Sequence, residues 1–335
     1  MKKIFQKNSH NIVNDNNKTT KKGVQTMKSN KWFILILGIA LLGLTGCEDE
    51  VVDEINEFDV LVEYLEGADG GYVNNMGSWI LGAGALNSEF DYSAYTVFDL
   101  RSADDFASMG IEGAINVTLT NMFDEADNVT GPILVTCYSG QTASFAHTLL
   151  RLKGHEAYVM KFGMSAYDIS LDKWTSNCSD QYAGDLVTTA SEALPTFDYP
   201  VLNTGFETAE EILDARIDAA IEAWSNGLLI LAGDVITDAS SYNIMNYWSE
   251  ADYLGHGHID GAYQLSPGTL TMDGNLSSFD PAGNNIFYCY TGQTAASSIA
   301  YLTVIGYDVK SIKFGFNNMH WSELPGHKWP KPFGF

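Results

Sequence analysis

The sequence predicts an α/β protein built from two homologous units, because one long segment occurs twice and each copy has the pattern strand, loop, helix, strand. Residues 137–143 read CYSGQTA, and residues 289–295 read CYTGQTA. Without a gap, the match continues to a shared Lys-Phe-Gly, at residues 161–163 and 313–315. A match of this length is an internal repeat, not a chance motif.

The repeat extends on both sides of this segment and gives each unit about a hundred residues, a usual size for a domain. Upstream, residues 95–106 lie over 242–253 and residues 111–114 over 259–262; downstream, DKW at 172–174 matches HKW at 327–329. We expect an N-terminal extension with a signal peptide (1–46), an acidic tether (47–59), a first domain (60–178), a linker (179–206) and a second domain (207–335).

The secondary structure around each cysteine can be read from the apolar pattern. Residues 132–136 and 285–288 are short apolar runs typical of buried parallel strands. Each following helix is expected to end before a glycine, Gly154 or Gly306, and AYVMKFG and VKSIKFG predict the next strands. Residues 208–224 predict a helix that opens the second unit. In such βαβ units the ligand site lies at the carboxyl ends of the strands, where both cysteines stand.

The amino terminus has the pattern of an export signal. From Met27, two lysines precede an apolar run over residues 32–44, which is shorter than a membrane span of about 20 residues. The run ends in Leu-Thr-Gly-Cys, which resembles the bacterial lipobox, so Cys47 is the expected lipidation site and first mature residue. We therefore expect a lipid-anchored protein of the cell envelope, in the outer membrane and facing the periplasm or the surface. Met27 is an alternative start to Met1.

The charge balance excludes one class of partner. The chain has 42 acidic and 18 basic residues, and removal of residues 1–46 leaves 41 and 10, a net charge of −31. Nucleic acid is excluded as a partner because binding it needs a basic surface. An anionic membrane surface is disfavoured for the same reason, so membrane attachment depends on the lipid. The acidic run after Cys47 fits an export signal or a solvated linker equally well.

The cysteines favour reactive thiols over structural disulfides. With Cys47 acylated, three remain, and two of them, Cys137 and Cys289, occupy equivalent positions in different units. A thiol between a strand and a helix N-terminus faces free backbone N–H groups and the positive end of the helix dipole. We expect this environment to lower the pKa of both thiols. Cys178 could resolve an intermediate on Cys137, although an inert linker thiol is the preferred reading.

The motifs together resemble the rhodanese (sulfurtransferase) superfamily. FDLRSADDF, GIEGAIN and CYSGQT in the first unit, and GHIDGA and CYTGQT in the second, are similar to its Asp-x-Arg strand end, Gly-His-Ile-x-Gly-Ala turn and Cys-x-x-Gly-x-Thr loop. The resemblance covers about residues 60–175 and 205–330. It implies two tandem rhodanese-like domains, each a five-stranded parallel sheet flanked by helices on both faces.

The resemblance also implies the chemistry. Cys137 and Cys289 would accept sulfane sulfur from thiosulfate or a persulfide donor and pass it to a thiol or cyanide, with no cofactor or metal. The loop residues that would hold the persulfide or the substrate are Tyr138, Ser139, Gly140, Gln141 and Thr142 in the first unit, and Tyr290, Thr291, Gly292, Gln293 and Thr294 in the second.

Neither unit has the complete family pattern. The first keeps the Asp-x-Arg pair as Asp99 and Arg101, which we expect to form a structural ion pair in preference to contacting substrate, but lacks the turn histidine. The second keeps His258, which we expect to bond to the backbone in preference to relaying protons. It has Asn246 and Trp248 at the positions of the Asp-x-Arg pair. Both units keep the cysteine, so the loops do not show which one is active.

The loops carry no fixed positive charge, in contrast to relatives that use thiosulfate. Together with the net charge of −31, which is screened beyond about 8 to 10 Å, this favours a neutral or weakly charged persulfide donor. Lys161 and Lys313 recur in both copies and could supply the missing charge or lie solvated at strand ends. Trp174 and Trp329 are expected to pack in the interior.

Two other functions were weighed against sulfur transfer. A phosphatase of this fold needs an arginine six residues after the cysteine, and Ala143 and Ala295 stand there. A catalytically weak binding or redox-sensing lipoprotein is the alternative that stays open. No CxxC or HExxH spacing occurs, and His256 and His258 are too few for a metal site.

Overall fold

The computed structural model describes residues 55–67 and 75–330. All of these belong to one compact body, Asp53–Phe335, which contains both repeat units. The signal peptide, Cys47 and most of the acidic tether that the sequence predicts lie outside the described residues. Within the described ranges, no helix is both long enough and apolar enough to cross a membrane.

The first sheet has five parallel strands in the order β1-β5-β4-β2-β3. Its strands are β1 (Ile80–Leu81), β2 (Thr96–Asp99), β3 (Ile115–Asn116), β4 (Ile133–Thr136) and β5 (Ala157–Met160). The central strand β4 is buried along its whole length, with Val135 aligned between Phe98 of β2 and Val159 of β5. A continuous apolar run is expected for a parallel strand that is covered on both faces.

The second sheet repeats this arrangement, with the order β10-β8-β11-β12-β7 and all pairs parallel. Its strands are β7 (Leu229–Ile230), β8 (Asn243–Asn246), β10 (Tyr263–Gln264), β11 (Asn285–Tyr288) and β12 (Val309–Ile312). Read from the other edge, each strand takes the position of its counterpart in the first sheet. The two five-stranded parallel sheets that the sequence predicted are therefore confirmed.

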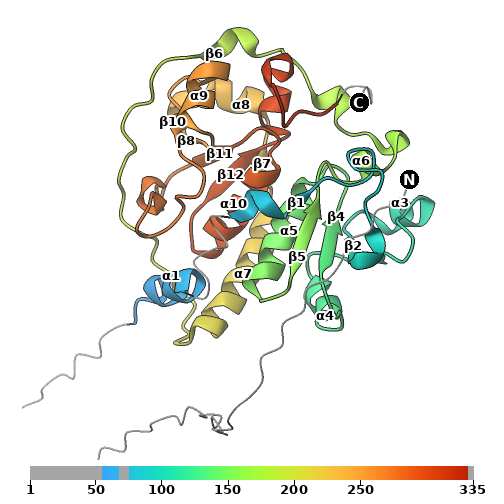
Figure 1. The fold of residues 1–335 in the computed structure, drawn as a ribbon. Coiled ribbons are helices and arrows are strands. Elements are labelled where there is room, and N and C mark those ends of the chain that lie inside the picture. The colour runs from blue at the N-terminus through green and yellow to red at the C-terminus, as the bar shows by residue number, and fades with distance from the viewer. Residues whose placement is uncertain (1–54, 68–74, 331–335) are drawn as a thin grey trace, which may run out of the picture. The chain divides into compact units, whose positions relative to one another are not determined.

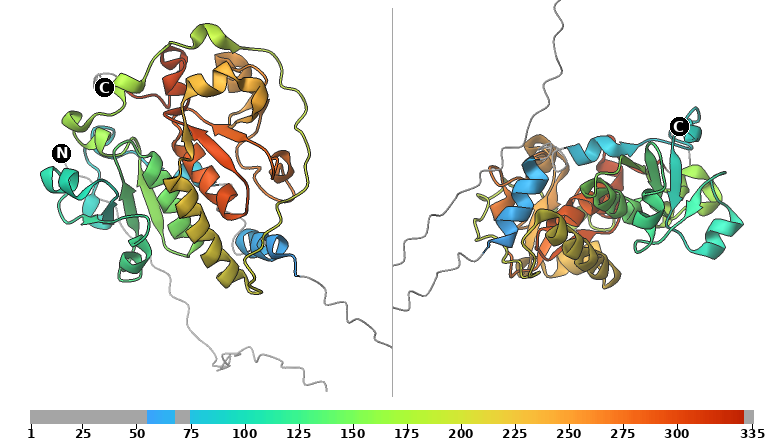
Figure 2. Two further views of the ribbon diagram at one scale, coloured as in Figure 1. Left: turned by 180° about the vertical axis from the view of Figure 1, so that it is seen from behind. Right: turned by 90° about the horizontal axis from the view of Figure 1, so that it is seen from below.

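Helices flank both sheets (Figures 1 and 2). They are α1 (Glu57–Gly67), α3 (Ala103–Ser108), α4 (Met122–Ala126), α5 (Gln141–Leu152), α6 (Met164–Tyr167), α7 (Ala209–Ser225), α8 (Ala232–Thr237), α9 (Glu250–His256) and α10 (Gln293–Val304). The helix predicted at residues 208–224 is α7, and the Thr208 side chain caps it by accepting from the N–H of Glu211. Gly154 and Gly306 follow α5 and α10 with φ of 89° and 109°, as expected for C-terminal caps.

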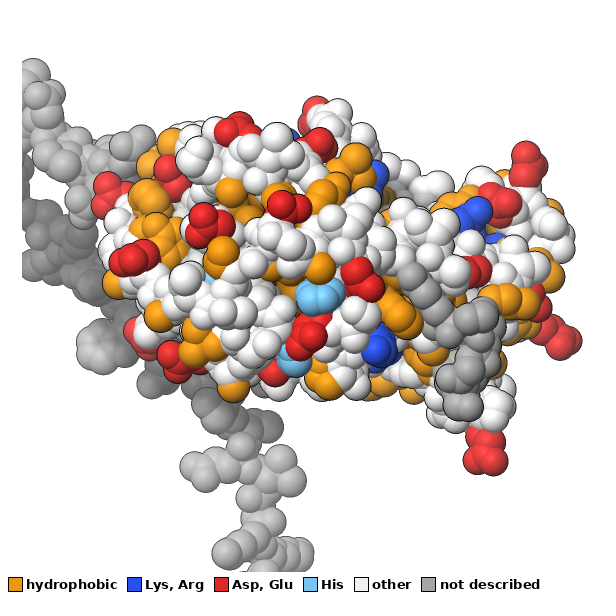
Figure 3. Space-filling model, turned by 90° about the horizontal axis from the view of Figure 1, so that it is seen from above, with side chains coloured by type: hydrophobic (Ala, Val, Ile, Leu, Met, Phe, Trp, Pro, Cys, Tyr) orange, Lys and Arg blue, Asp and Glu red, His pale blue; other side chains and the backbone are white. Residues whose placement is uncertain are grey.

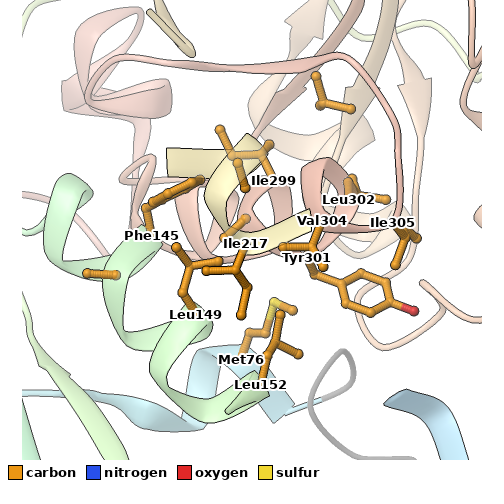
Figure 4. Packing of buried hydrophobic residues seen from close by; sticks show 14 of the residues in the cluster. Met76, Phe145, Leu149, Leu152, Ile217, Ile299, Tyr301, Leu302, Val304 and Ile305 are labelled. Carbon is orange, nitrogen blue, oxygen red and sulfur yellow. The ribbon is translucent and has the colours of Figure 1, made fainter. Parts of the chain in front are cut away.

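Helices α5 and α10 pack against each other, and each also covers the sheet of its own unit (Figure 1). The Ser297 Oγ of α10 donates to the Ser144 carbonyl of α5 at 3.2 Å, so the two backbones approach closely. Figure 4 shows Phe145 and Leu149 of α5 beside Ile217 of α7 and Ile299 of α10 in one buried cluster. The two units therefore share one hydrophobic cluster, in addition to a further buried cluster that lies mainly in each unit.

Two glutamines from the cysteine loops form a reciprocal clasp between the units. Gln141 Oε1 accepts the backbone N–H of Phe314 at 2.8 Å, and Gln293 Oε1 accepts the N–H of Phe162 at 2.9 Å. Both glutamines are buried. Phe162 and Phe314 have φ of 64° and 60°, a left-handed conformation that non-glycine residues rarely adopt. The clasp satisfies the N–H group of each strained residue with a side chain from the other unit.

Aromatic rings close the interface beside the clasp. Trp174 of the first unit lies 4.8 Å from the Phe162 ring and 4.9 Å from the Phe314 ring, measured between centroids. Trp329 of the second unit lies 5.2 Å from Phe162 and is fully buried, as Trp174 is. The prediction that both tryptophans pack in the interior is confirmed.

Helix α1 and residues 179–206 contact mainly the second unit. In residues 179–206, β6 (Leu186–Val187) pairs antiparallel with β9 (His258–Ile259), and the segment continues around the outside of the second sheet (Figure 2). Helix α1 packs on α7, and the Glu57 carboxylate accepts the N–H groups of Thr204 and Gly205 at 2.7 and 2.8 Å. The chain thus contacts the second unit before it enters the first sheet.

We expect Gln293→Leu to lower the free energy of unfolding by about 1–3 kcal/mol, because it leaves the buried N–H of Phe162 without a partner. Urea denaturation monitored by tryptophan fluorescence measures the change. Gln181, which is exposed, provides a matched control: Gln181→Leu should change stability by less than about 0.5 kcal/mol. Equal effects of the two substitutions would show that the clasp is not a stabilising contact.

Candidate functional site

Each cysteine lies between a strand and a helix N-terminus, where backbone N–H groups point at its sulfur. The Cys137 Sγ accepts from the N–H groups of Gly140 (3.2 Å) and Ala143 (3.4 Å), and the Cys289 Sγ accepts from Ala295 (3.3 Å). Gly140 and Gly292 have φ of 84° and 71°, and this left-handed turn aims the loop amides inward. The predicted backbone N–H groups that face the sulfur, called the N–H cradle below, are present in both units.

The thiols themselves differ from the sequence expectation. Cys137 and Cys289 are each only 3% exposed. Burial raises the pKa of both thiols above the ordinary value, because desolvation disfavours a thiolate, and the loop N–H groups offset this only in part. The prediction that the cradle lowers the pKa of both thiols is wrong for the fold as it stands, since a sequence shows the amides but not the depth of burial.

The repeated Lys-Phe-Gly segment supports the cysteine loops from behind. A side chain at Gly163 or Gly315 would overlap the carbonyl oxygen of the cysteine in its own unit, and both glycines have positive φ. These carbonyls accept backbone N–H groups that follow the glycines, from Met164 at 2.8 Å and Phe316 at 3.0 Å. Sequence reasoning gave these glycines no role, although their repetition was the signal that could have identified them.

The first loop is braced by hydrogen bonds and a buried ion pair. The Arg101 guanidinium bonds to the Asp99 carboxylate at 2.7 Å and also donates to the Met109 carbonyl, which stands where the family turn has its glycine. The Tyr138 hydroxyl bonds to the Asp105 carboxylate and contacts Ser102. Asp99 and Arg101 thus form the expected ion pair, which positions the turn beside the loop.

The Ser139 side chain and carbonyl contact a residue of the loop and a residue from the segment that follows α6. The Ser139 Oγ accepts from the Gln141 Nε2 at 3.1 Å, and the Ser139 carbonyl accepts from the Trp174 Nε1 at 3.2 Å. Thr142 lies in the first turn of α5 and is partly exposed.

The second loop is braced by stacked rings instead. Trp248, at the position of Arg101, stacks on Tyr290 with ring centroids 4.5 Å apart, and His327 stacks on Tyr290 at 5.1 Å. The Tyr290 hydroxyl donates to the Asp252 carboxylate at 2.8 Å. Burial, with a smaller contribution from Asp252, raises the pKa of Tyr290 well above its ordinary value. In the second unit, which lacks the Asp-x-Arg pair, stacked rings therefore support the loop in place of the ion pair.

His258 lies away from the second cysteine loop. Its Nδ1 is 3.0 Å from the Tyr253 carbonyl oxygen, and its ring stacks on Tyr253 at 3.5 Å. Burial lowers the pKa of His258, so the ring is neutral at pH 7. This agrees with the expectation of a turn histidine bonded to the backbone.

Cys178, the cysteine between the two repeat units, is buried. It lies near Trp174 and Trp329, and its Sγ is 3.9 Å from the Asn317 Oδ1. The three cysteines of the described residues form no disulfide. Its role in resolving an intermediate stays an untested prediction.

A cavity of about 420 Å³ opens over the second cysteine. The second unit contributes Cys289, Tyr290, Thr291, Thr294, Tyr247, Pro267 and His327, and the first contributes Asn75, Met76, Gly77, Ser78, Ile80 and Lys161. Cys137 is not among the lining residues. Gly292 and Gln293 are also absent from the lining, because Gln293 faces the first unit in the clasp. Of the loop residues predicted for the second unit, the structure brings Tyr290, Thr291 and Thr294 together with the thiol.

The family comparison agrees with this fold. Residues 83–170 match the family model described as a rhodanese-like domain. These residues are a rhodanese-like domain. The match spans about a quarter of the chain and lies in the first unit; the second unit repeats the rhodanese-like strand order and cysteine loop. None of the curated proteins matches the chain.

Three solved structures illustrate the structural similarity. Thiosulfate sulfurtransferase from Pseudomonas aeruginosa is 14% identical with a TM-score of 0.30, over 83% of this chain and 49% of that chain. A 3-mercaptopyruvate sulfotransferase from Escherichia coli is 16% identical with a TM-score of 0.26, over 70% and 97%. A rhodanese-related protein from Thermoplasma volcanium is 19% identical with a TM-score of 0.24, over 26% and 88%. These values are too low to transfer an activity to this chain.

The raised thiol pKa predicts a distinct pH dependence. We expect the rate of Cys289 alkylation by iodoacetamide to keep rising with pH above about 8.5, the ordinary pKa of cysteine, because only the thiolate reacts. Mass spectrometry of the alkylated peptide at several pH values measures the rate, and the same protein unfolded in urea is the control. A rate that levels off below about pH 8 in the folded protein would show that the loop N–H groups outweigh burial.

Proposed function

We propose that this protein is a sulfurtransferase in which Cys289 accepts sulfane sulfur as a persulfide and passes it to a thiol or cyanide. The observation that carries the proposal is the meeting of this thiol, its N–H cradle and a cavity large enough for a small molecule. Cys137 has the same cradle and is the second candidate thiol.

In the proposed reaction, the Cys289 thiolate attacks the outer sulfur of a donor R–S–S⁻, and R–S⁻ leaves. The N–H of Ala295, already 3.3 Å from the Sγ, and the neighbouring loop amides would stabilise the anionic persulfide. An acceptor thiolate then attacks the outer sulfur and restores the Cys289 thiolate. With cyanide as acceptor, the product is thiocyanate.

A binding or redox-sensing role is the second candidate, and one observation favours the binding role. Both thiols are buried with raised pKa, which reduces their reactivity at pH 7. A protein of this kind would bind a partner without turning over a sulfur donor, whereas a redox sensor needs an exposed thiol of low pKa.

Intact-mass analysis separates the two functions. We expect the form lacking residues 1–47, which keeps the whole compact body, to gain about 32 Da, one sulfur atom, after exposure to a low-molecular-weight persulfide or thiosulfate. Dithiothreitol should reverse the gain. Cys137→Ser should keep it and Cys289→Ser should lose it. Sulfur on Cys137 alone would overturn the choice of Cys289, and no adduct on a folded protein would favour the binding or sensing role.

We also propose that Cys47 carries a lipid and holds the protein in the cell envelope, at the outer membrane and facing the periplasm or the surface. The Leu-Thr-Gly-Cys sequence after an apolar run supports this. Cys47→Ser should move the protein from the membrane pellet to the soluble fraction, or leave its signal peptide uncleaved, as immunoblots of fractionated cells would show. Membrane association and processing that are unchanged in this variant would exclude the lipid anchor.

A further inference from the structure

The lining of the cavity over Cys289 differs in charge from the rest of the protein. The chain has 42 acidic and 18 basic residues, and acidic side chains are scattered over the face shown in Figure 3, where few Lys and Arg side chains are seen. The residues that the structure describes in the cavity lining, in contrast, include no carboxylate and do include Lys161 and His327. The cavity is therefore a local exception in a strongly acidic molecule, which favours an anionic ligand there.

Lys161 is the basic side chain of this lining, and burial lowers the pKa of its ammonium below the ordinary value. It is partly buried, and its ammonium forms no salt bridge within the part of the chain that the structure describes. Its Nζ lies 5.3 Å from the centre of the Phe162 ring. Burial lowers the pKa of His327, and the charge of Lys161 lowers it further, so His327 is neutral at pH 7. A half-buried ammonium without a carboxylate leaves room for an anionic partner.

The contacts between the units hold Lys161 at this position. The Lys161 N–H donates to the Leu81 carbonyl at 2.8 Å, which extends the pairing of β5 with β1 by one residue. The next residue, Phe162, turns into the left-handed conformation and donates its N–H to Gln293 of the Cys289 loop. The same loop that carries the thiol therefore fixes the backbone next to the lysine.

Three other lining residues can contact the apolar part of an organic ligand. Met76 and Ile80 from the first unit and Pro267 from the second are apolar. The volume of about 420 Å³ lies within the range of about 300–1,000 Å³ typical of small-molecule sites. A ligand that combines an acid group with a small apolar body would satisfy both the ammonium and these side chains.

We propose that Lys161, supplied by the first unit, determines specificity at Cys289 by binding the acid group of an organic persulfide donor. This inference rests on the proposed sulfurtransferase function and specifies its donor class. It differs from the donor expected from the loop sequences alone, which carry no charge. In the reaction, the Cys289 thiolate bonds to the outer sulfur of the donor, the donor S–S bond breaks, and the donor leaves as a thiolate that still carries its acid group.

Two donors that differ in a single charge test this inference. They are the persulfides of N-acetylcysteine and of its amide, which share their sulfur chemistry but not the carboxylate. The rate of the mass gain of about 32 Da on Cys289 is measured for each donor, in the form lacking residues 1–47. The wild type should load sulfur from the acid at least about tenfold faster than from the amide. This ratio corresponds to the free energy of one charge-assisted hydrogen bond.

Lys161→Met should remove this preference while it still allows loading from the amide. Lys313→Met is the matched control, because Lys313 is the repeat counterpart of Lys161 and does not line this cavity; it should keep the preference. A preference that is absent in the wild type, or that survives in Lys161→Met, would overturn the role of Lys161. If neither donor loads Cys289 of the wild type, the proposed sulfurtransferase function itself fails.

Discussion

The packing of α5 against α10, with the reciprocal clasp at their N-termini, is the contact on which the rest of the structure depends. Each helix begins in a cysteine loop, so the contact between the helices also fixes the relative position of the two loops. Gln141 and Gln293 then accept the N–H of the strained phenylalanine in the Lys-Phe-Gly segment of the other unit. The cavity over Cys289 exists because the first unit is held there.

Two opposed effects act on each thiol. The loop amides stabilise an anionic sulfur, whereas removal of the sulfur from water destabilises it, and burial has the larger effect in this fold. In the proposed persulfide, the charge would lie one atom further from the buried Sγ than in the free thiolate. The same surroundings can therefore suit a loaded sulfur better than the free thiol, and such a difference favours loading by a donor.

The fold could be predicted in detail from the sequence, and the site only in part. The strands before Cys137 and Cys289 and the helices after them follow from local patterns, which a single repeat unit already contains. The partner of Gln293 could not be predicted, because a polar residue beside a cysteine resembles a substrate contact and Phe162 is distant in the sequence. The raised thiol pKa depends on how deeply each thiol is buried, and the place of Lys161 depends on how the two units pack. Both are properties of the tertiary structure.

The reciprocal clasp has the form of a contact in a two-fold symmetric dimer, in which the same patch serves on both partners. Two separate copies would form such a contact only when their concentration exceeds the dissociation constant. Here a single chain carries both copies, and residues 179–206 connect them along the outside of the second sheet. The effective concentration of one unit around the other is set by this connection. Completion of the cavity is therefore a step of folding, independent of how many molecules the cell makes.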